Sequence, residues 1–537
     1  MTAANTKDRV YLYDSTLRDG AQTQGVDFSA SDKAAIASAL DSIGIDYVEG
    51  GWPGANPTDD AFFDAPPRMT RARLTAFGMT RRAGRSADND PGLQALLGTK
   101  ARIATMVGKT WDLHCTLALG VELDENVRMI RDSIAMAAGR MEEAMFDAEH
   151  FFDGYKANRD FALECVSAAA EAGARWVVLC DTNGGTLPDE LEEIIADVTR
   201  YVPGDRLGIH CHDDTGNAVA NSLAAVRAGV RQIQGTLNGL GERCGNANLI
   251  SIIPSLMLKM GYDTGLSEAD LRGLKSASRV LDERLNRAPD RQAPYVGESA
   301  FAHKGGLHVS AVAKDPRCYE HVTPESVGNR RQILVSNQAG RSNVMARFEE
   351  IGLEVKADTN QVASLLDKVK DLEAQGFTYD GADASFELLA RRELGSVPDY
   401  FKLDAFRVID ERRYNAKGEL TVLSEATIKI EVEGEKYMTV AEGTGPINAL
   451  DNALRKVLIP IYPQLAGVKL VDYKVRILSP DAATAAITRV MIESTDETGS
   501  SWTTVGASGN VIEASYNALY DSLTYKLFKE ASNRAAA

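Results

Sequence analysis

The chain has 537 residues, a net charge of −17 at pH 7, and the ordinary globular mix of 44% hydrophobic and 25% charged residues. This length exceeds that of one typical domain, so we expect a large core and at least two folding units. The acidic excess argues against a nucleic acid or an anionic membrane as the main partner, because phosphate groups are held by clustered Lys and Arg.

The N-terminus and the cysteines indicate the cellular compartment. The first ten residues, MTAANTKDRV, contain no apolar stretch typical of a signal peptide, and no segment approaches the ~20 apolar residues that span a bilayer. The six cysteines form no CxxC pair and no regular spacing, which indicates neither a disulfide framework nor a thiolate zinc site. We therefore expect a cytoplasmic protein with reduced, mostly buried thiols.

Short β-rich runs alternate with helical stretches through the first half of the chain. Eight strands are predicted, at residues 10–15, 47–50, 73–79, 101–107, 142–149, 176–181, 207–212 and 232–237. Helices are predicted at residues 31–43, 124–139, 159–173, 189–201 and 216–229, with Ser31 and Asp189 as N-caps and Gly44, Gly173 and Gly229 at the C-terminal ends. This α/β pattern favours a (β/α)8 TIM barrel, and an open doubly wound sheet is the alternative.

A barrel of this kind builds its site from the loops that follow the strands. Polar and reactive side chains should therefore gather at the C-terminal ends of the predicted strands. The sequence meets this requirement with Asp14 to Asp19, Glu49, Asp147, Glu149, Asp181, Thr182, His210, His212, Asp213, Asn238, Glu242, Arg243 and Asn246.

The stretch GIHCHDDTGNA indicates a metal site. Side chains alternate along a strand, so His210 and His212 lie on one face while Cys211 points to the other. Two imidazoles and one carboxylate suit a divalent cation, and Asp19 at the end of the first strand is the candidate carboxylate. The alternative is a pair of structural histidines bonded to carboxylates in a half-buried strand.

Arg18 is a candidate for stabilising an oxygen that becomes negative during a reaction, because a guanidinium stays charged and donates from a planar fork. A buried Arg needs a carboxylate, and Glu49 on the second strand is well placed. The structural alternative is an ion-pair network of Arg18, Glu49 and Asp14 that closes the barrel.

Further candidates for acid–base chemistry and binding follow later strands. Glu149 is flanked by aromatic residues that we expect to desolvate it and raise its pKa toward that of a general base. Thr182 offers a hydroxyl to a substrate carboxylate, with loop architecture as the alternative. In the glycine-rich segment FAHKGGLHVS, His303 and His308 are either surface residues or groups that a mobile loop brings over the barrel mouth.

The C-terminal part of the chain has a different texture. Residues 265–395 are predicted to be largely helical, and from about Asp404 alternating strands precede helices. Five residues recur at an offset of 65 positions: Ile447, Ala449, Asn452, Ala453 and Leu454 correspond to Ile512, Ala514, Asn517, Ala518 and Leu519. We interpret this as an internal duplication that gives two βββα units around a pseudo-twofold axis, with chance matching in an Ala-rich helix as the alternative.

Four stretches, STLRDGAQ, YVEGG, HCHDDTGNAVAN and NGLGERCGNANL, occur in this order. With them the chain resembles the DRE-TIM metallolyases, which include acetyl-CoA-dependent synthases and HMG-CoA lyases. The C-terminal repeat resembles the allosteric dimer domain of the synthases, which disfavours a lyase. The resemblance implies a catalytic TIM barrel at residues 1–265, helical linker subdomains at 266–395 and a LeuA-type allosteric dimer domain at 396–537.

The resemblance also implies a ligand set. Asp19, His210 and His212 would bind a divalent metal ion (Mg, Mn or Zn), with Asn246 as a further or water-bridged ligand. Arg18 would polarise the keto oxygen of the substrate, and Glu49 would hold Arg18.

Other residues acquire roles by the same resemblance. Thr182 would bind the carboxylate of a 2-keto acid. Glu149 and His308 would assist removal of a proton from the acetyl group of acetyl-CoA, and Tyr319 would join them.

The stretches YDSTLRDGAQTQGVDFS and EGGWPGANPTD point within this family to members that condense acetyl-CoA with pyruvate, giving (R)-citramalate and CoA for isoleucine synthesis. Met79, Met106 and Val107 are candidates to narrow the substrate pocket to the size of a methyl group. The alternatives are a synthase for a larger 2-keto acid, as 2-isopropylmalate and homocitrate synthases are, and a non-catalytic metabolite sensor. The resemblance further implies a homodimer with isoleucine as feedback inhibitor.

Overall fold

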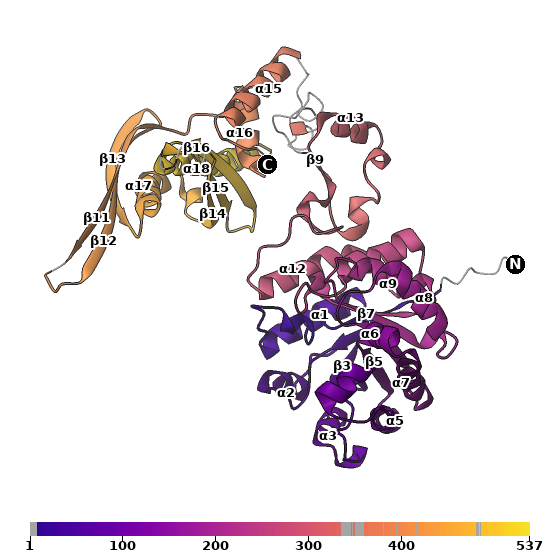
Figure 1. Ribbon diagram of the computed structural model, residues 1–537. Helices are drawn as coiled ribbons and strands as arrows, with labels where there is room; N and C mark the ends of the chain where they lie inside the picture. Colours follow the sequence, from indigo (N-terminus) through magenta and orange to yellow (C-terminus); the bar gives the residue numbers. More distant parts are fainter. Residues whose placement is uncertain are drawn as a thin grey trace. The chain divides into compact units, whose positions relative to one another are not determined.

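The computed structural model describes residues 8–333, 345, 347–348, 359–379, 381–393, 395–414, 416–478, 483 and 485–536. Two compact units divide the chain: one runs to Phe301 and includes Glu320–Arg331, and the other consists of Ala302–Tyr319 and the residues from Gln332 onward (Figure 1). Among the described residues, no helix is both long and apolar enough to cross a membrane.

The first unit is a closed eight-stranded parallel barrel, which confirms the predicted TIM-barrel class (Figure 1). Each strand pairs with the next, and β1 pairs with β8 to close the barrel. The strands are β1 (Tyr11–Asp14), β2 (Tyr47–Glu49), β3 (Arg73–Met79), β4 (Ile103–Lys109), β5 (Glu143–Glu149), β6 (Trp176–Asp181), β7 (Leu207–Cys211) and β8 (Gln232–Gly235).

Helices surround the barrel at the predicted places. They include α1 (Ala30–Ile43), α2 (Pro57–Asp64), α3 (Pro91–Leu97), α4 (Asp112–His114), α5 (Leu123–Arg140), α6 (Phe151–Ala157), α7 (Arg159–Glu171), α8 (Pro188–Val198), α9 (Ala218–Arg227), α10 (Leu249–Pro254), α11 (Glu268–Arg272) and α12 (Leu274–Arg284). Gly44 caps α1 in the left-handed conformation at φ 89°, as predicted.

Both predicted N-caps are wrong. Helix α1 begins two residues earlier than Ser31 suggests, because Ser29 and Asp32 form a reciprocal capping box. Helix α8 begins with Pro188, which has no N–H to satisfy, and Leu187 precedes it without a side-chain cap.

Alternation along the barrel strands separates two cores. The inner cluster consists of Tyr13, Tyr47, Ile103, Met145, Trp176, Val178 and Cys180, while neighbouring residues of the same strands pack outward against the helices. The inner cluster fills the barrel below the level of the polar strand ends.

In the second unit, β9 (Ala302–His303) pairs with β10 (Gln332–Ile333), and α13 (Gly306–Lys314) follows β9. His308 lies on this helix, Gly306–Lys314, and not on a loop as the mobile-loop alternative required. Helices α15 (Thr359–Ala374) and α16 (Asp383–Glu393) confirm the predicted helical character of the middle region.

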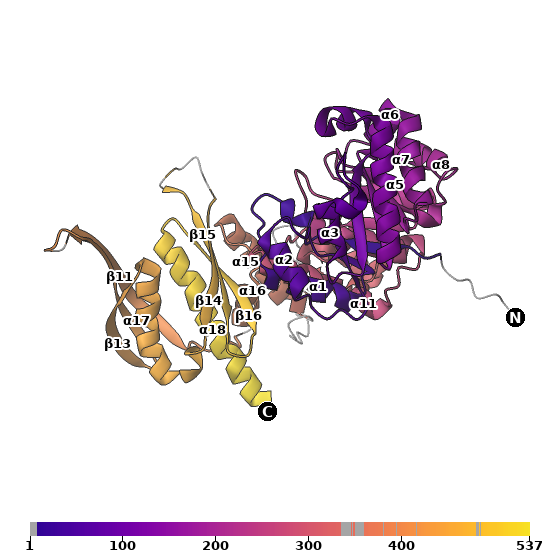
Figure 2. The ribbon, with the colours of Figure 1, turned by 90° about the horizontal axis from the view of Figure 1, so that it is seen from below.

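Two βββα units complete the chain, as the repeat predicts. The first has β11 (Phe401–Tyr414), β12 (Leu420–Val432), β13 (Glu435–Gly443) and α17 (Pro446–Ile461); the second has β14 (Lys469–Ile477), β15 (Thr488–Thr495), β16 (Ser501–Ser508) and α18 (Val511–Ala536). Figure 2 shows α17 along the first antiparallel sheet and α18 along the second. Both units contribute to one hydrophobic cluster.

Candidate metal centre and active site

Asp19, His210 and His212 converge at the C-terminal end of the barrel. His210 Nε2 lies 3.1 Å and His212 Nε2 3.9 Å from the same atom, Asp19 Oδ2. One ligand atom from each of the three buried residues lies within 4.8 Å of the others. The predicted convergence of the first and seventh strands therefore occurs, in a geometry that can hold a cation.

Asn246 completes this cluster from the loop after β8. Its Nδ2 donates to Asp19 Oδ2 at 2.7 Å and lies 3.5 Å from His210 Nε2. Asn246 Oδ1 is buried and has no hydrogen-bond partner among the described residues, and the same holds for His212 Nδ1. An unpaired buried oxygen beside a carboxylate and two imidazoles fits a divalent cation, because amide and carboxylate oxygens are ordinary ligands of Mg²⁺ and Mn²⁺.

The electrostatics of the cluster favour cation binding. Burial opposes the charge of Asp19, but Arg18 and His210 outweigh burial and hold the pKa of this carboxyl well below its usual range. Burial, with the neighbouring His210, lowers the pKa of His212 to about 4. His212 is therefore a neutral imidazole at physiological pH, which is the form that binds metals.

Arg18 lies beside the cluster and is held from two sides. Its Nε donates to Glu49 Oε2 at 2.8 Å, and its guanidinium carbon lies 3.8 Å from the centre of the Phe77 ring. Tyr13 donates its hydroxyl proton to the other oxygen of Glu49 at 2.8 Å. Burial opposes the charge of Arg18, but Glu49 and Asp19 outweigh burial and raise its pKa, so Arg18 presents a fixed positive charge.

Asp14 connects two loops, whereas the sequence analysis considered it as part of an ion-pair network with Arg18 and Glu49. Thr16 donates to Asp14 from its amide and from its hydroxyl, both at 2.9 Å, and Thr16 Oγ1 accepts from the Leu237 amide at 2.8 Å. Asp14 therefore links the loop after β1 to the loop after β8. Burial raises the pKa of Asp14 to about 7.

Glu149 lies at the end of β5 directly opposite Lys109, the last residue of β4, and the two side chains form an ion pair. The expected enclosure by aromatic residues is wrong, because Phe151 and Phe152 are buried in the outer core. Lys109 holds the Glu149 carboxylate instead.

Thr182 is half-buried after β6, and its Oγ1 accepts a hydrogen bond from the His150 amide at 2.9 Å. Loop architecture is therefore one role of Thr182. The hydroxyl keeps its own proton for a further acceptor.

Strand alternation distinguishes the three residues that the sequence analysis assigned to the substrate pocket. Met79 at the end of β3 is 37% exposed, and Val107 on β4 is half-buried. Met106 is fully buried in the outer core, on the face of β4 opposite to Val107. The assignment of Met106 to the pocket is therefore wrong.

His308 and Tyr319 belong to the second unit. His308 is an exposed residue of α13, and its ring stacks on Tyr319 with ring centres 4.2 Å apart. His303 is buried on β9. The pairing of His308 with Tyr319 was not apparent from the sequence.

Several polar residues after the strands cap loops rather than line the metal cluster. Asp181 accepts from the Thr186 hydroxyl, Asp213 accepts from the amide of Ala218 at the start of α9, and Asn238 binds Ser278 and Asp282. Arg243 pairs with Asp214 and, at 3.7 Å, with the exposed Glu242.

Three residues near the site escaped the sequence analysis: Phe77, Lys109 and Gln234. Nothing in the sequence distinguishes Phe77 and Lys109 from other aromatic or charged residues of a strand. Gln234 on β8 accepts from His210 Nδ1 at 2.9 Å and donates from Nε2 to Asp147 Oδ1 at 3.0 Å. The sequence alone does not reveal this contact, because the contact depends on the register between β7 and β8.

Family models match three consecutive parts of the chain. The HMGL-like model matches residues 9–279, the homocitrate synthase post-HMGL domain-like model matches residues 295–376, and the LeuA allosteric (dimerisation) domain matches residues 380–527. The domain boundaries expected at residues 265 and 395 stay predictions.

Characterised relatives extend over nearly the whole chain. The (R)-citramalate synthases of Aquifex aeolicus and Geobacter sulfurreducens are each 50% identical over 97% of this chain and 98% of the relative. The 2-isopropylmalate synthase of Methylorubrum populi is 32% identical over 85% of each chain. The barrel thus belongs to a class of lyase-like and synthase enzymes that the motifs had indicated. The chain belongs to the HMGL-like family and, within it, to the (R)-citramalate synthases.

Proposed function

We propose that the protein is an acyltransferase that condenses acetyl-CoA with pyruvate and gives (R)-citramalate and free CoA, on the route to isoleucine. The observation that carries this proposal is the buried cluster of Asp19, His210 and His212 beside the charged Arg18. The 50% identity to (R)-citramalate synthases over 97% of the chain supports the choice of substrates.

In this proposal Asp19, His210 and His212, with Asn246, hold a divalent cation. When bound, the cation supplies Lewis acidity toward the 2-keto acid. Arg18 donates to the keto oxygen and stabilises the negative charge that this oxygen acquires. Glu49 keeps the guanidinium in place through the 2.8 Å contact with Nε.

The proton chemistry is assigned to Glu149, assisted by His308 and Tyr319. Loss of a proton from the acetyl methyl group gives an enolate, whose carbon forms a bond to the keto carbon of pyruvate. The electron pair of the keto bond moves to oxygen, Arg18 stabilises the resulting alkoxide, and the alkoxide takes up a proton equivalent to the one that Glu149 removed. Water then hydrolyses the thioester and releases CoA, while Thr182 is assigned to the pyruvate carboxylate.

The choice of pyruvate over larger 2-keto acids is the finer part of the proposal. Discrimination by an apolar pocket contributes only ~1–3 kcal/mol per methylene, and we assign it to Met79 and Val107 at the ends of β3 and β4. Initial rates with pyruvate, 2-ketoisovalerate and 2-ketoglutarate, read as thiol release from acetyl-CoA, test this choice. We expect pyruvate to give the highest kcat/KM, and comparable turnover of a larger acid would contradict the proposal.

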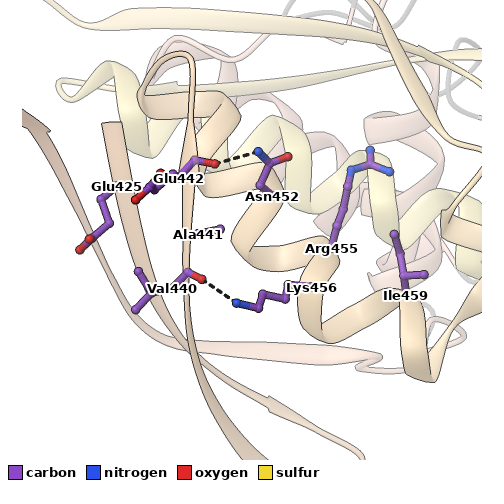
Figure 3. Close-up of a pocket in the computed structure, with 8 residues that line it drawn as sticks. All are labelled: Glu425, Val440, Ala441, Glu442, Asn452, Arg455, Lys456 and Ile459. Atoms are coloured by element: carbon purple, nitrogen blue, oxygen red, sulfur yellow. Dashed lines mark hydrogen bonds between the residues drawn. The ribbon is translucent and has the colours of Figure 1, made fainter. Parts of the chain in front are cut away.

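We also propose that the protein is a homodimer that isoleucine inhibits. A groove of about 710 Å³ in the first βββα unit is lined by Glu425, Val440, Ala441, Glu442, Asn452, Arg455, Lys456 and Ile459 (Figure 3). Asn452 Nδ2 donates to the Glu442 carbonyl at 3.0 Å, and Lys456 Nζ donates to the Val440 carbonyl at 3.1 Å (Figure 3). Charges of both signs beside aliphatic side chains suit an amino acid with a branched side chain.

Inhibition assays with isoleucine, and with leucine as control, test this regulatory proposal. The duplication supplies a matched pair of variants, because Asn517 occupies in the second unit the place of Asn452 in the first. We expect Asn452→Ala to weaken inhibition by isoleucine and Asn517→Ala to leave it unchanged. Absence of both binding and inhibition by isoleucine would refute the proposal.

A location in the cytoplasm stays a prediction.

A further inference from the structure

Gln234 connects the candidate metal ligand His210 to Asp147, a buried carboxylate on the opposite side of the barrel. His210 and Gln234 are paired residues of β7 and β8, with Nδ1 of the imidazole 2.9 Å from Gln234 Oε1. The amide of Gln234 donates to Asp147 Oδ1 at 3.0 Å. All three side chains are at most 5% exposed.

The direction of these hydrogen bonds follows from the chemistry of the groups. Burial raises the pKa of Asp147 to about 7, and its carboxyl keeps an accepting oxygen in either form. The NH₂ group of Gln234 therefore faces Asp147 and its carbonyl oxygen faces His210. A carbonyl oxygen cannot donate, so His210 carries its proton on Nδ1. The other ring nitrogen, Nε2, faces Asp19 Oδ2 at 3.1 Å, and once it has lost its proton it supplies a lone pair to a cation.

We infer that Gln234 is a positioning residue, which orients His210 and keeps its Nε2 free to bind the metal, and that Asp147 fixes the direction of the Gln234 amide. This inference rests on the metal site proposed above. Contacts of this kind beyond the ligands typically change metal affinity by ~10–100-fold.

Residue 232 provides a matched control. Gln232 lies two positions before Gln234 on the same face of β8 and is also fully buried. Its amide has only a 3.7 Å contact with Met145 Sδ, and its Oε1 has no hydrogen-bond partner among the described residues. Gln232→Leu therefore removes a buried amide of the same strand without affecting His210.

The experiment titrates Mn²⁺ into the full-length metal-free protein and counts free Mn²⁺ by electron paramagnetic resonance. We expect Gln234→Leu to weaken Mn²⁺ binding by ~10–100-fold, and Gln232→Leu to leave it unchanged. Thermal unfolding of both variants separates loss of binding from loss of the fold. Equal Mn²⁺ affinity in Gln234→Leu and the wild type would overturn the inference.

An exchange of the two groups tests the direction of the hydrogen bonds. Gln234→Glu alone places two carboxylates in contact and is expected to weaken binding. In the double variant Gln234→Glu/Asp147→Asn, the new amide donates to the new carboxylate, which still accepts from His210 Nδ1. Recovery of affinity in the double variant supports the inference, and affinity no better than that of Gln234→Glu contradicts it. Failure of the wild type to bind Mn²⁺ would refute the metal site as well.

Discussion

In the barrel, each strand is covered on both faces, whereas the first C-terminal sheet, β11 to β13, is covered by α17 on only one face. Charged groups inside the barrel are paired, as Arg18 is with Glu49. The C-terminal sheets expose apolar side chains, among them Val422 (61%), Met438 (67%) and Val471 (55%), and Met438 lies on the uncovered face of the first sheet, opposite Lys429. The barrel therefore brings Asp19, His210 and His212 together within one chain, while we expect exposed apolar side chains of this kind to take part in self-association.

Removal of one imidazole should have the largest effect on this self-contained cluster. We expect His210→Ala to abolish turnover of acetyl-CoA and pyruvate, because two ligands remain where three converge. Thiol release measures the loss. Cys211→Ala is the control, since Cys211 faces the outer core on the same strand. Unchanged turnover in His210→Ala would exclude its role at the metal.

Arg18→Gln should reduce kcat by ~10²–10³-fold, the usual effect of removing a donor to a developing oxyanion. Glutamine can still donate to Glu49 but carries no charge, so the loss is expected in kcat more than in protein stability. Steady-state kinetics and a thermal melt separate the two. A variant that changes only KM would mean that Arg18 binds substrate equally in the ground state and the transition state.

A charged residue on the uncovered face of the first C-terminal sheet tests whether this face takes part in self-association. We expect Met438→Lys to weaken self-association, because a lysine at the centre of an apolar contact must be desolvated on association. Size-exclusion chromatography with light scattering, over a range of protein concentrations, gives the dissociation constant. Leu117→Lys, at a 78% exposed position of the barrel unit, is the control and should leave association unchanged. Equal behaviour of both variants would contradict an interface on β13.

The smallest effect is expected from Asp14→Asn, as a shift with pH. Burial raises the pKa of Asp14 to about 7, so the folded protein holds a proton there that the unfolded chain loses near its ordinary pKa of about 4. The stability contributed by this group is therefore full below about pH 4 and lost as the pH rises to about 7. Asparagine does not titrate, so the Tm of the variant should gain on the wild type between about pH 4 and pH 7, and the difference should be constant above that range. A constant difference within that range would contradict the raised pKa.

The fold was largely predictable because its strands and helices follow from local sequence patterns. Two of the eight strands, β3 and β6, begin and end at the predicted residues, since alternating apolar runs between helices mark them clearly. The convergence of Asp19 with His210 and His212 was also predictable, because strand ends of a parallel barrel share one rim.

The errors concern contacts that local patterns do not encode. Met106 differs from Val107 by one position, and this one-residue step reverses the face on which a side chain lies. Gln234 and Lys109 depend on which residues of neighbouring strands are paired, and Ser29 was missed because Ser31 is an equally good cap by residue type. Side-chain partners 40 to 90 positions apart need the register of the whole barrel.

The hydrogen bond between Asn246 and Asp19 joins residues 227 positions apart. A growing chain on the ribosome therefore cannot assemble this cluster until β8 and the following loop have emerged, long after Asp19. A cation held there would bind the closed barrel and not the earlier, open forms, so its binding free energy adds directly to the closure of the barrel.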